Sequence, residues 1–532
     1  MTEARAGVAR RALWLSRLLE RPYWLAPLPG VLLAQCYGRA HAAGLAILAL
    51  ALFAALLWRS GDLGAGARAR RGALLGLGFG LGWFAAGIWW LYISMAVYGG
   101  MPRLLAAAAV LLFSLYLALF PALAGALAAL LAPPSSRQPW PLARGLAAAA
   151  ALAGGWTLAE VLRGTLFTGF PWLAVGYSQV GGPLAGLAPL LGTYGVGFAA
   201  VLAAGLLALA TQYNLRHTTL AILLLLLLAL GAGRLGSLRW THAVGAPLRV
   251  ALLQGDIPQQ QKFRPEALAP TLQLYSQWLH TLRADLIVTP ETALPVPPQD
   301  LPAGFLQQLQ HSLRERHVHA LVGIPLTRGA DGYTNSVLGL GDRQPYRYDK
   351  AHLVPFGEFI PYGFHWFVRL MNMPLGDFAR GTFDQPSFAV DGRRVAPTIC
   401  YEDLFGEQLA QRFIDPARAP QVIANLTNLA WFGDTEVLPQ HLQIARMRSL
   451  EFQLPSIRAT NTGVTAIIDA RGRVSAELPP YTTGALLGSV QPASGVTPFA
   501  WLAARLGYLP VLLLALLALL PGLLLRLPTI RA

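Results

Sequence analysis

Three strand-like segments of the sequence each end in a side chain that can take part in acyl chemistry. Glu291 closes the segment IVTPE, Lys350 ends YRYDK, and Cys400 ends RVAPTIC. Ligand sites of α/β sheets gather at the carboxyl ends of strands, so three such ends can meet at one point. There a carboxylate can take the proton of a thiol, the thiolate can attack a carbonyl carbon, and an ammonium can stabilise the oxyanion that forms.

Each of these residues also has an ordinary structural explanation. A lone cysteine at a strand end is most often a small buried apolar residue, and a glutamate before a turn is most often solvated. Lys350 differs, because the chain contains 39 arginines and only two lysines, Lys262 and Lys350. Arginine is too wide and too permanently charged to replace a compact donor beside a thiol, so a lysine here is not surface filler.

The composition excludes a purely soluble protein and a disordered one. Of the 532 residues, 55% are apolar and only 13% are charged, and the mean hydropathy is +0.47; a soluble domain averages about 25% charged residues. The net charge of +15 comes from arginines, many of which flank apolar segments as in membrane proteins. No compact basic stripe with interleaved aromatic residues occurs, so no nucleic-acid partner is expected.

The sequence contains no recognisable motif for a metal or a cofactor. Its two cysteines, Cys36 and Cys400, do not form a metal-binding pair. A disulfide between them is not expected, because one lies among apolar residues near the start of the chain and the other deep in the polar part. No glycine-rich GxGxxG turn follows a strand and no phosphate-binding loop is present. We therefore expect no metal site and no cofactor.

Long apolar windows predict a polytopic helical membrane domain. A helix that crosses a bilayer needs about 20 apolar residues. Residues 1–240 are predicted to be a transmembrane domain, 247–495 one globular domain and 500–526 a C-terminal transmembrane helix, which makes about eight spans. The seven windows of the first domain are 12–34, 41–58, 73–94, 103–132, 142–162, 184–210 and 218–236.

The arginines beside these windows predict their orientation. With the N-terminus in the cytoplasm, fourteen arginines next to the spans face the cytoplasm and only Arg39, Arg103 and Arg163 face the other side. Basic residues are enriched on the cytoplasmic side of membranes. After seven spans the globular domain then lies outside the cytoplasm, which in a bacterial cell is the periplasm.

The globular segment alternates strand-like and helix-like patterns. Its strand candidates are 248–254, 285–291, 319–325, 336–340, 394–402, 421–427 and 464–470, and its helix candidates are 265–283, 303–317, 405–414 and 438–453. Several strands are apolar over four or five consecutive residues, as expected when both faces of a sheet are covered. The pattern predicts an α/β sandwich.

The order of Glu291, Lys350 and Cys400, each after a strand, resembles the nitrilase (carbon–nitrogen hydrolase) superfamily, whose fold is an αββα sandwich. Neighbouring words narrow the resemblance to its membrane-integrated apolipoprotein N-acyltransferase family. These words are LLQGDIPQ (252–259), KAHLVPFGEFIP (350–361), ICYED (399–403), NLAWFGD (428–434), QHLQIARMRSLE (440–451), RATNTGVTA (458–466) and, in the membrane part, GIWWLYISMAVYGGMP (87–102) and TGFPWLAVGYSQ (168–179). The resemblance covers nearly the whole chain.

This resemblance implies a two-step acyl transfer, the last step of bacterial lipoprotein maturation. Glu291 matches the family's general base, Lys350 its oxyanion-stabilising lysine and Cys400 its nucleophile. The acyl donor would be a phospholipid, typically phosphatidylethanolamine, and the acyl chain would pass through a thioester on Cys400. The acceptor would be the α-amine of the diacylglyceryl-cysteine of an apolipoprotein. We expect a monomeric, multi-pass protein of the inner membrane.

The resemblance also implies supporting residues, namely Asn335, Glu358, Tyr401 and Glu402. Glu358 would position Lys350 or assist Glu291, with a purely structural ion pair as the alternative. Two aromatic residues are expected to contact substrate. Trp431 matches a mobile aromatic near the mouth of the site, although an exposed tryptophan can also anchor at a membrane surface. Phe263 stands where the family commonly has tryptophan, so an indole N–H is lost there.

Two other functions stay open on the sequence. A membrane-tethered amidase would use the same three residues on a small soluble amide, but it would not need eight spans or the aromatic-rich segment 168–179. A membrane scaffold or transporter with a decayed hydrolase domain would leave the Glu–Lys–Cys set without a purpose. Its spans also carry few charges that could form an ion path.

Overall fold

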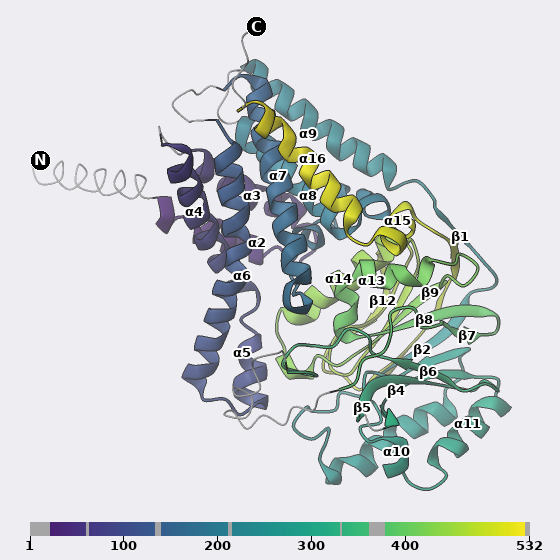
Figure 1. Ribbon diagram of the computed structural model, residues 1–532. Helices are drawn as coiled ribbons and strands as arrows, with labels where there is room; N and C mark the ends of the chain where they lie inside the picture. Colours follow the sequence, from purple (N-terminus) through teal and green to yellow (C-terminus); the bar gives the residue numbers. More distant parts are fainter. Residues whose placement is uncertain are drawn as a thin grey trace, which may run out of the picture.

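The computed structural model describes residues 22–59, 63–133, 140–210, 215–329, 332–360 and 378–526. The first half of the chain forms a helical bundle and the second half an α/β domain, and the two pack against each other (Figure 1). The chain enters the α/β domain through β1 (Thr241–Ala243) and leaves it through β14 (Ala493–Gly495). These two strands pair antiparallel, so the entry and the exit lie side by side.

The bundle is made of helices rich in Leu, Ala and Gly: α2 (Pro27–Ala34), α3 (Ala43–Trp58), α4 (Ala65–Gly87), α5 (Leu91–Ile93), α6 (Arg103–Leu131), α7 (Leu142–Thr165), α8 (Ala188–Ala210) and α9 (Leu215–Leu235). In the described residues, four helices are long and apolar enough to cross a membrane, or up to six if each of two bent helix pairs is one span. About eight spans therefore stays a prediction. The first expected window, 12–34, lies partly outside the described residues.

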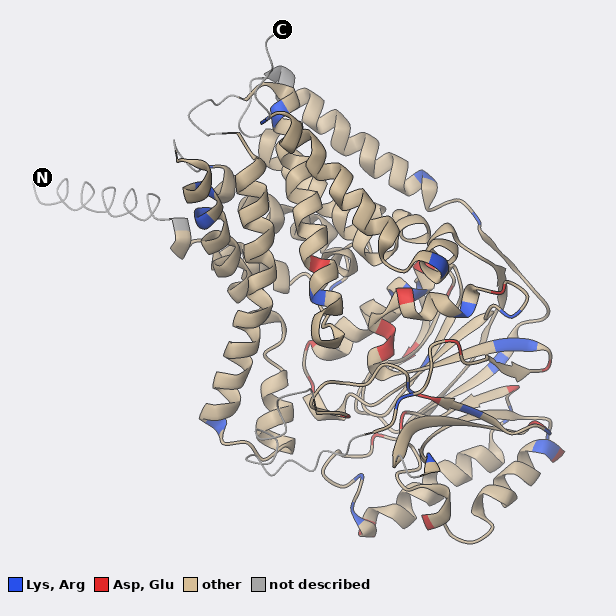
Figure 2. Ribbon diagram, viewed as in Figure 1, with Lys and Arg blue, Asp and Glu red and all other residues tan. Residues whose placement is uncertain are grey.

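The outward faces of the bundle are apolar. Helix α9 exposes Leu223, Leu226, Leu227 and Leu230, and Figure 2 shows long stretches of the bundle without charged residues. A contiguous exposed apolar surface of this kind is rare in soluble proteins and is what contact with lipid tails requires. Helices α7 and α8, in contrast, are mostly buried by their neighbours. The bundle is therefore built as a membrane protein, with α7 and α8 at its centre.

The expected single C-terminal helix over 500–526 is wrong in one respect. The segment forms α15 (Pro498–Leu506) and α16 (Leu509–Leu524), which are bent by 96°. The break falls at Gly507, which has a φ of +56°. A residue with a side chain would be strained in this conformation. Phe499 of α15 packs with Phe413 and Phe452 in the core of the α/β domain. Only α16 lies along the bundle, where it packs against α7.

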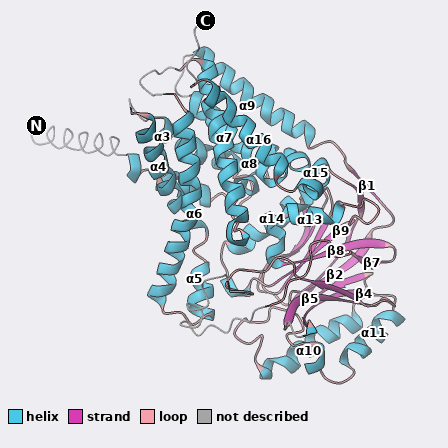
Figure 3. Cartoon of the chain, viewed as in Figure 1, coloured by secondary structure: helices cyan, strands magenta, loops and turns pink. Residues whose placement is uncertain are grey.

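Two six-stranded sheets form the centre of the α/β domain (Figure 3). One has the order β13–β2–β3–β4–β5–β6 and the other the order β12–β11–β10–β9–β8–β7. Three neighbouring strands run parallel in each sheet, β2 to β4 and β8 to β10. The strands are β2 (Leu248–Gln254), β3 (Leu286–Val288), β4 (His319–Thr327), β5 (Tyr333–Leu340), β6 (Tyr346–Asp349), β7 (Phe388–Val390), β8 (Arg393–Ile399), β9 (Val422–Thr427), β10 (Ser456–Thr460), β11 (Thr465–Ile468), β12 (Val474–Leu478) and β13 (Gly484–Val490).

The layers confirm the αββα sandwich. Apolar side chains of facing strands, such as Val250 and Val288 from one sheet and Ala424 and Ile457 from the other, fill the space between the sheets. Helices α10 (Pro265–Thr281) and α11 (Phe305–Glu315) cover the outer face of the first sheet. Helix α14 (Val437–Phe452) lies on the second sheet and shares a continuous apolar core with the bundle. The second helical layer is therefore also the junction between the two halves of the molecule.

Three local expectations need correction. The strand predicted over 394–402 ends at Ile399, because Cys400 leaves the extended conformation. The helix predicted over 405–414 is broken into α13 (Gly406–Leu409) and a 3₁₀ turn, Ala410–Phe413. Arg163 does not mark a loop. It lies buried in the last turn of α7, next to Glu160, and donates hydrogen bonds to the carbonyls of the segment 168–179.

Candidate active site

The three predicted catalytic residues follow strands that end at one edge of the sandwich. Glu291 comes three residues after β3, and Lys350 directly follows β6 of the same sheet. Cys400 directly follows β8, which belongs to the other sheet. The electrostatic influence of both Glu291 and Lys350 reaches the thiol of Cys400. The structure therefore brings the carboxylate, the ammonium and the thiol together, as the sequence predicts.

Lys350 lies between two carboxylates. Its Nζ is 2.8 Å from Oε1 of Glu358 and 3.4 Å from Oε1 of Glu291. The amide of Asn335 donates to the same two oxygens, at 2.7 and 2.8 Å, and the carbonyl of Asn335 accepts from the backbone N–H of Lys350. Asn335 and Lys350 each donate to both carboxylates, so together they fix the position of Glu291 relative to Glu358. Two of the four supporting residues, Asn335 and Glu358, thus touch Glu291 and Lys350 or each other.

Charge interactions decide the pKa of Lys350. Burial lowers the pKa of its ammonium, but the negative charges of Glu358 and Glu291 more than offset this effect and raise it above its usual range. Burial raises the pKa of the Cys400 thiol, and the charge of Glu291 adds to the rise, whereas Lys350 lowers it. The resting thiol is therefore protonated at neutral pH. It needs a base beside it to become a nucleophile.

Cys400 has a strained backbone at the end of its strand. Its φ of +49° lies in the left-handed region, which costs a residue with a side chain about 1 kcal/mol or more. The carbonyl of Cys400 is held by Nε2 of His441 at 3.2 Å and faces Nδ2 of Asn425 at 3.5 Å. Cys400 is partly exposed although the strand before it is buried. The sharp turn after β8 therefore presents the thiol at the edge of the sandwich.

A buried network fixes the ring of His441. Arg458 donates from Nη2 to Nδ1 of His441 at 2.6 Å, so Nε2 carries the proton that is donated to Cys400. Burial and the charge of Arg458 lower the pKa of His441 well below its usual value, so the ring stays neutral. Asp403 faces the guanidinium of Arg458 at 3.5 Å. His441 is a positioning group for the nucleophile that the sequence analysis did not identify.

Tyr401 and Glu402 connect the nucleophile to neighbouring segments by hydrogen bonds. The hydroxyl of Tyr401 donates to the carbonyl of Gly169 at 2.9 Å, which ties the residue after the nucleophile to the segment 168–179 of the bundle. The carboxylate of Glu402 accepts from the backbone N–H groups of Ala351, His352 and Ile399 and from the hydroxyl of Tyr348. Glu402 therefore joins the chain after Lys350 to the chain before Cys400.

The segment 168–179 reaches further into the site. The ring of Trp172 stacks on His441 with a centroid distance of 5.4 Å, and its indole N–H donates to Gln440 at 2.8 Å. Arg163 of α7 donates to the carbonyls of Phe170 and Trp172, at 2.6 and 2.7 Å. Bundle residues thus contact both neighbours of the nucleophile, Tyr401 along the chain and His441 in space. The membrane half of the chain is part of the site.

Besides His441, the structure brings Lys262 to the site, a residue that the sequence analysis did not propose for it. Lys262, in the loop after β2, is buried, and its Nζ donates to the backbone carbonyl of Glu291 at 2.9 Å. Burial lowers its pKa to about 8, while Glu291 and Cys400 raise it. A signal was available, because Lys262 is one of only two lysines in the chain. The argument from lysine scarcity applies to it as well as to Lys350.

The two aromatic residues proposed for substrate contact are both exposed. Trp431 is 38% exposed and forms an edge-to-face contact with Tyr98 of the bundle, with ring centroids 6.0 Å apart. Phe263 is 58% exposed, whereas its neighbour Lys262 is buried. Their exposure permits a lipid contact, and that contact stays a prediction.

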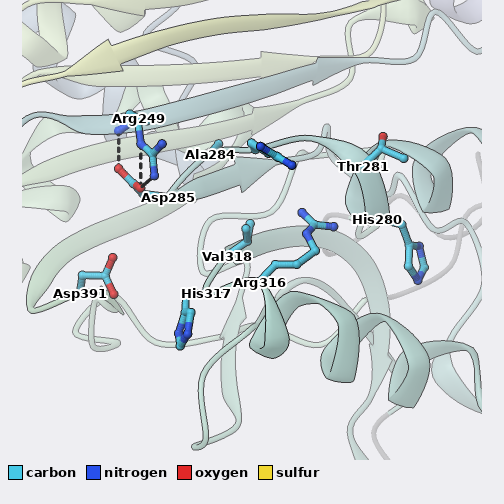
Figure 4. A pocket seen from close by; sticks show the side chains of 10 residues that line it. Arg249, His280, Thr281, Ala284, Asp285, Arg316, His317, Val318 and Asp391 are labelled. Carbon is cyan, nitrogen blue, oxygen red and sulfur yellow. Dashed lines mark hydrogen bonds and ion pairs between the residues drawn. The ribbon is translucent and has the colours of Figure 1, made fainter.

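A hollow at the opposite end of the strands contains none of the predicted site residues. Its volume is about 590 Å³, and Figure 4 shows its lining, with Arg249 and Asp285 joined by an ion pair near the starts of β2 and β3. Within the described part of the chain, no group of three or more His, Cys, Asp or Glu side chains could hold a metal ion.

Two family models match the chain. Residues 29–206 match the apolipoprotein N-acyltransferase N-terminal domain, and residues 249–496 match carbon-nitrogen hydrolase. The first match covers most of the bundle, and the second begins in β2 and ends just before α15. The two halves seen in the structure therefore correspond to two separate family models.

Curated relatives are similar over most of their length. The apolipoprotein N-acyltransferase of Ralstonia nicotianae is 48% identical over 501 residues, which cover 94% of this chain and 92% of the relative. That of Verminephrobacter eiseniae is 49% identical, with coverage of 82% and 84%. That of Bordetella bronchiseptica is 44% identical, with coverage of 84% and 86%.

Proposed function

The chain belongs to the apolipoprotein N-acyltransferase family, and from this premise we propose that it moves an acyl chain from a membrane phospholipid to the N-terminus of diacylated apolipoproteins. The donor is a glycerophospholipid such as phosphatidylethanolamine. The acceptor is the α-amine of the diacylglyceryl-cysteine. The acyl chain is carried between them as a thioester on Cys400.

One observation supports this proposal most directly. The group of Glu291, Lys350 and Cys400 is completed by contacts from the apolar bundle, through Tyr401 and Gly169 and through His441 and Trp172. An enzyme for small soluble amides needs only Glu291, Lys350 and Cys400 and not the contacts from the bundle. An enzyme with two lipid substrates needs its nucleophile beside a surface that lipid chains can reach.

In the first half-reaction, the carboxylate of Glu291 takes the proton of the Cys400 thiol and the sulfur attacks the ester carbonyl carbon of the phospholipid. The C–S bond forms as the carbonyl oxygen becomes an oxyanion, which the ammonium of Lys350 stabilises. The C–O bond to glycerol then breaks, and Glu291 returns its proton to the leaving alkoxide. Lysophospholipid departs and the thioester remains.

In the second half-reaction, the α-amine of the apolipoprotein attacks the thioester carbonyl. Glu291 takes a proton from the attacking nitrogen and passes it to the departing sulfur. The C–N bond forms, the C–S bond breaks, and the Cys400 thiol is regenerated. Because one lipid leaves before the other reacts, the kinetics are ping-pong. Water must be excluded in between, since hydrolysis of the thioester would make the enzyme a phospholipase.

The proposed chemistry requires the α/β domain on the outer face of the bacterial inner membrane, where apolipoproteins present their modified cysteine. The distribution of loop arginines supports that side, because basic residues are enriched on the cytoplasmic side of membranes. The exposed leucines of α9 support insertion of the bundle itself.

Intact-mass measurement tests the proposal. The full-length protein is incubated with phosphatidylethanolamine in detergent micelles, and one acyl group should be added and mapped to Cys400. Addition of a diacylated lipopeptide with a free amine should remove this adduct and yield the triacylated peptide. A soluble amide should not compete.

Cys400→Ser is the matched control. A serine hydroxyl is far harder to ionise than a thiol beside a single carboxylate, so this variant should show no adduct and no triacylated product while it unfolds at the wild-type temperature. An adduct on another residue, or lipopeptide acylation by the Ser variant at the wild-type rate, would reject the thioester route.

A further inference from the structure

Both lysines of the chain lie against one residue of the site. Lys350 approaches the carboxylate of Glu291, with Nζ 3.4 Å from Oε1, and Lys262 donates to the backbone carbonyl of Glu291 at 2.9 Å. The other 39 basic residues of the chain are arginines. Lys262 is 4% exposed and Lys350 is 1% exposed. Buried lysines are rare unless they are paired, so each requires an explanation.

The charges of the site balance only if Lys262 is included. Glu291 and Glu358 contribute two buried carboxylates, and Lys350 contributes one ammonium that contacts both. Without a second cation this group would carry a net negative charge in a buried place, which is costly. Two other carboxylates lie nearby. Glu402 accepts four hydrogen bonds from neutral donors, and Asp403 is paired with the guanidinium of Arg458.

We propose that Lys262 is a further cation of the site beside Lys350, a positioning residue that holds the backbone at Glu291 and favours the thiolate of Cys400 by its charge. It does so without contact to the reacting atoms, through the carbonyl it binds and through the electric field it adds. The proposal rests on the proposed function only in taking Cys400 as the nucleophile.

The direction of the effect follows from the groups that surround the thiol. Those that act on Cys400 are the carboxylates of Glu291 and Glu358 and the cations of Lys350, Arg458 and Lys262, while the neutral ring of His441 binds its carbonyl. Removal of one cation leaves the negative charges less compensated. The thiolate then forms less readily, because an opposite charge favours the ionised form of a neighbouring group, typically by about one pKa unit or more.

Loss of the charge has a pH signature that loss of a packing contact lacks. Burial brings the pKa of Lys262 to about 8, so the wild-type ammonium is charged at pH 7 and becomes neutral as the pH rises above 8. A variant without this ammonium should differ from wild type at low pH and converge with it at high pH. A merely structural disturbance would leave a gap of the same size at every pH.

The experiment measures alkylation of Cys400 by iodoacetamide between pH 6 and pH 10, by mass spectrometry of the full-length protein in detergent. All variants carry Cys36→Ser, so that only Cys400 reports; Cys36 is fully buried in the bundle. Lys262→Met removes both the charge and the hydrogen bond. Lys262→Gln removes the charge but keeps an N–H donor.

Both variants should react about tenfold more slowly than wild type at pH 7, and their rates should meet the wild-type rate above about pH 9. Arg446→Met is the matched control. It removes another cation that donates to a backbone carbonyl, that of Gly472, at 2.7 Å and outside the site. Its alkylation profile should stay at wild type.

Wild-type alkylation profiles for both Lys262 variants, or a rate deficit that does not change with pH, would overturn the proposal. A deficit in Lys262→Met that Lys262→Gln restores would also overturn it, because the hydrogen bond and not the charge would then matter. The readout uses no lipid. A wild-type protein that forms no acyl thioester would therefore contradict the proposed function without altering this result.

Discussion

Two buried charge clusters of the molecule differ in how they are balanced. The site cluster consists of Glu291, Glu358, Lys262 and Lys350, two carboxylates with two ammonium groups. The junction cluster lies where α13 and α14 meet α8, and it consists of Glu407, Glu451, Arg448 and Thr193. It has two carboxylates and one guanidinium.

The two clusters also differ in how completely their carboxylate oxygens are hydrogen-bonded. In the site cluster, both oxygens of Glu291 accept, from Asn335 and Lys350 on one side and from the backbone N–H of Asn428 on the other. In the junction cluster, Oε1 of Glu451 accepts three donors, but Oε2 has no partner among the described residues.

The imbalance appears in the pKa of Glu407. Burial raises it to about 7, and the charge of Glu451 adds to the rise while Arg448 opposes it. The junction cluster therefore holds a proton near neutral pH. The two clusters differ in composition, because the site cluster has one cation for each carboxylate and the junction cluster has one cation for two carboxylates.

The largest expected effect is at Lys350, the ammonium that contacts both carboxylates of the site cluster. Lys350→Arg keeps the charge but widens the head group in a place where Nζ is already 2.8 Å from Glu358. The displaced guanidinium can no longer point a donor at the oxyanion, so thioester formation should fall by at least about 100-fold. Single-turnover measurement of the acyl adduct checks this. Near-normal turnover would show that positive charge alone suffices.

The next largest effect is expected from a substitution that removes the cation of the junction cluster. Arg448→Met leaves Glu407 and Glu451 without their cation, and removal of one partner of a buried ion pair typically costs about 3 kcal/mol. Because the carboxylates can take up protons instead, the loss of stability should be smaller at pH 5 than at pH 8. Chemical unfolding at both pH values measures this.

Arg446→Met, on the same helix, serves as control and should cost less at pH 8 with little dependence on pH. Equal destabilisation by the two substitutions would mean that the junction cluster is no more than a packing contact. Thioester formation by the folded fraction of Arg448→Met should stay close to wild type, since this cluster does not touch the reacting groups.

The smallest effect concerns Glu407 alone. Its folded-state pKa of about 7 lies above the ordinary value of 4.5, so the folded protein binds more protons than the unfolded chain between these values. Stability of the wild type therefore falls as pH rises through this window. Glu407→Gln cannot ionise, and it should be more stable than wild type above pH 7, by about 3 kcal/mol at most.

Near pH 4.5 the two proteins should unfold alike, and the difference should grow up to about pH 8. The exposed Glu477→Gln on β12 is the control and should show no such trend. A constant difference between Glu407→Gln and wild type at every pH would mean that this carboxylate is already ionised in the folded state.

Much of the fold could be predicted because its strands are locally apolar. The segment 248–254 coincides with β2, and 319–325 lies within β4. Strands with mixed polarity were missed. Strand β10 (SIRAT) is buried along its whole length, yet its sequence contains a serine, an arginine and a threonine. These polar groups are tolerated inside because the structure supplies partners such as His441 for Arg458.

The candidate site shows the same division. Glu291, Lys350 and Cys400 could be named because each ends a strand-like segment, and strand ends meet at one edge of an α/β sheet. Lys262 and His441 could not be placed by that rule, since one lies in a loop and the other on a helix. The residues next to Lys262 and His441 in the sequence do not indicate that either side chain lies beside Glu291 or Cys400.

By itself the sequence determined where apolar helices and strands form and which three side chains carry the proposed chemistry, since apolar patterning and residue type are local properties. Only the tertiary structure determined the bend between α15 and α16, the left-handed backbone of Cys400 and the contribution of bundle residues to the site. It also decided which buried charges are balanced. Burial and charge balance arise from contacts between distant segments, and no single stretch of sequence contains them.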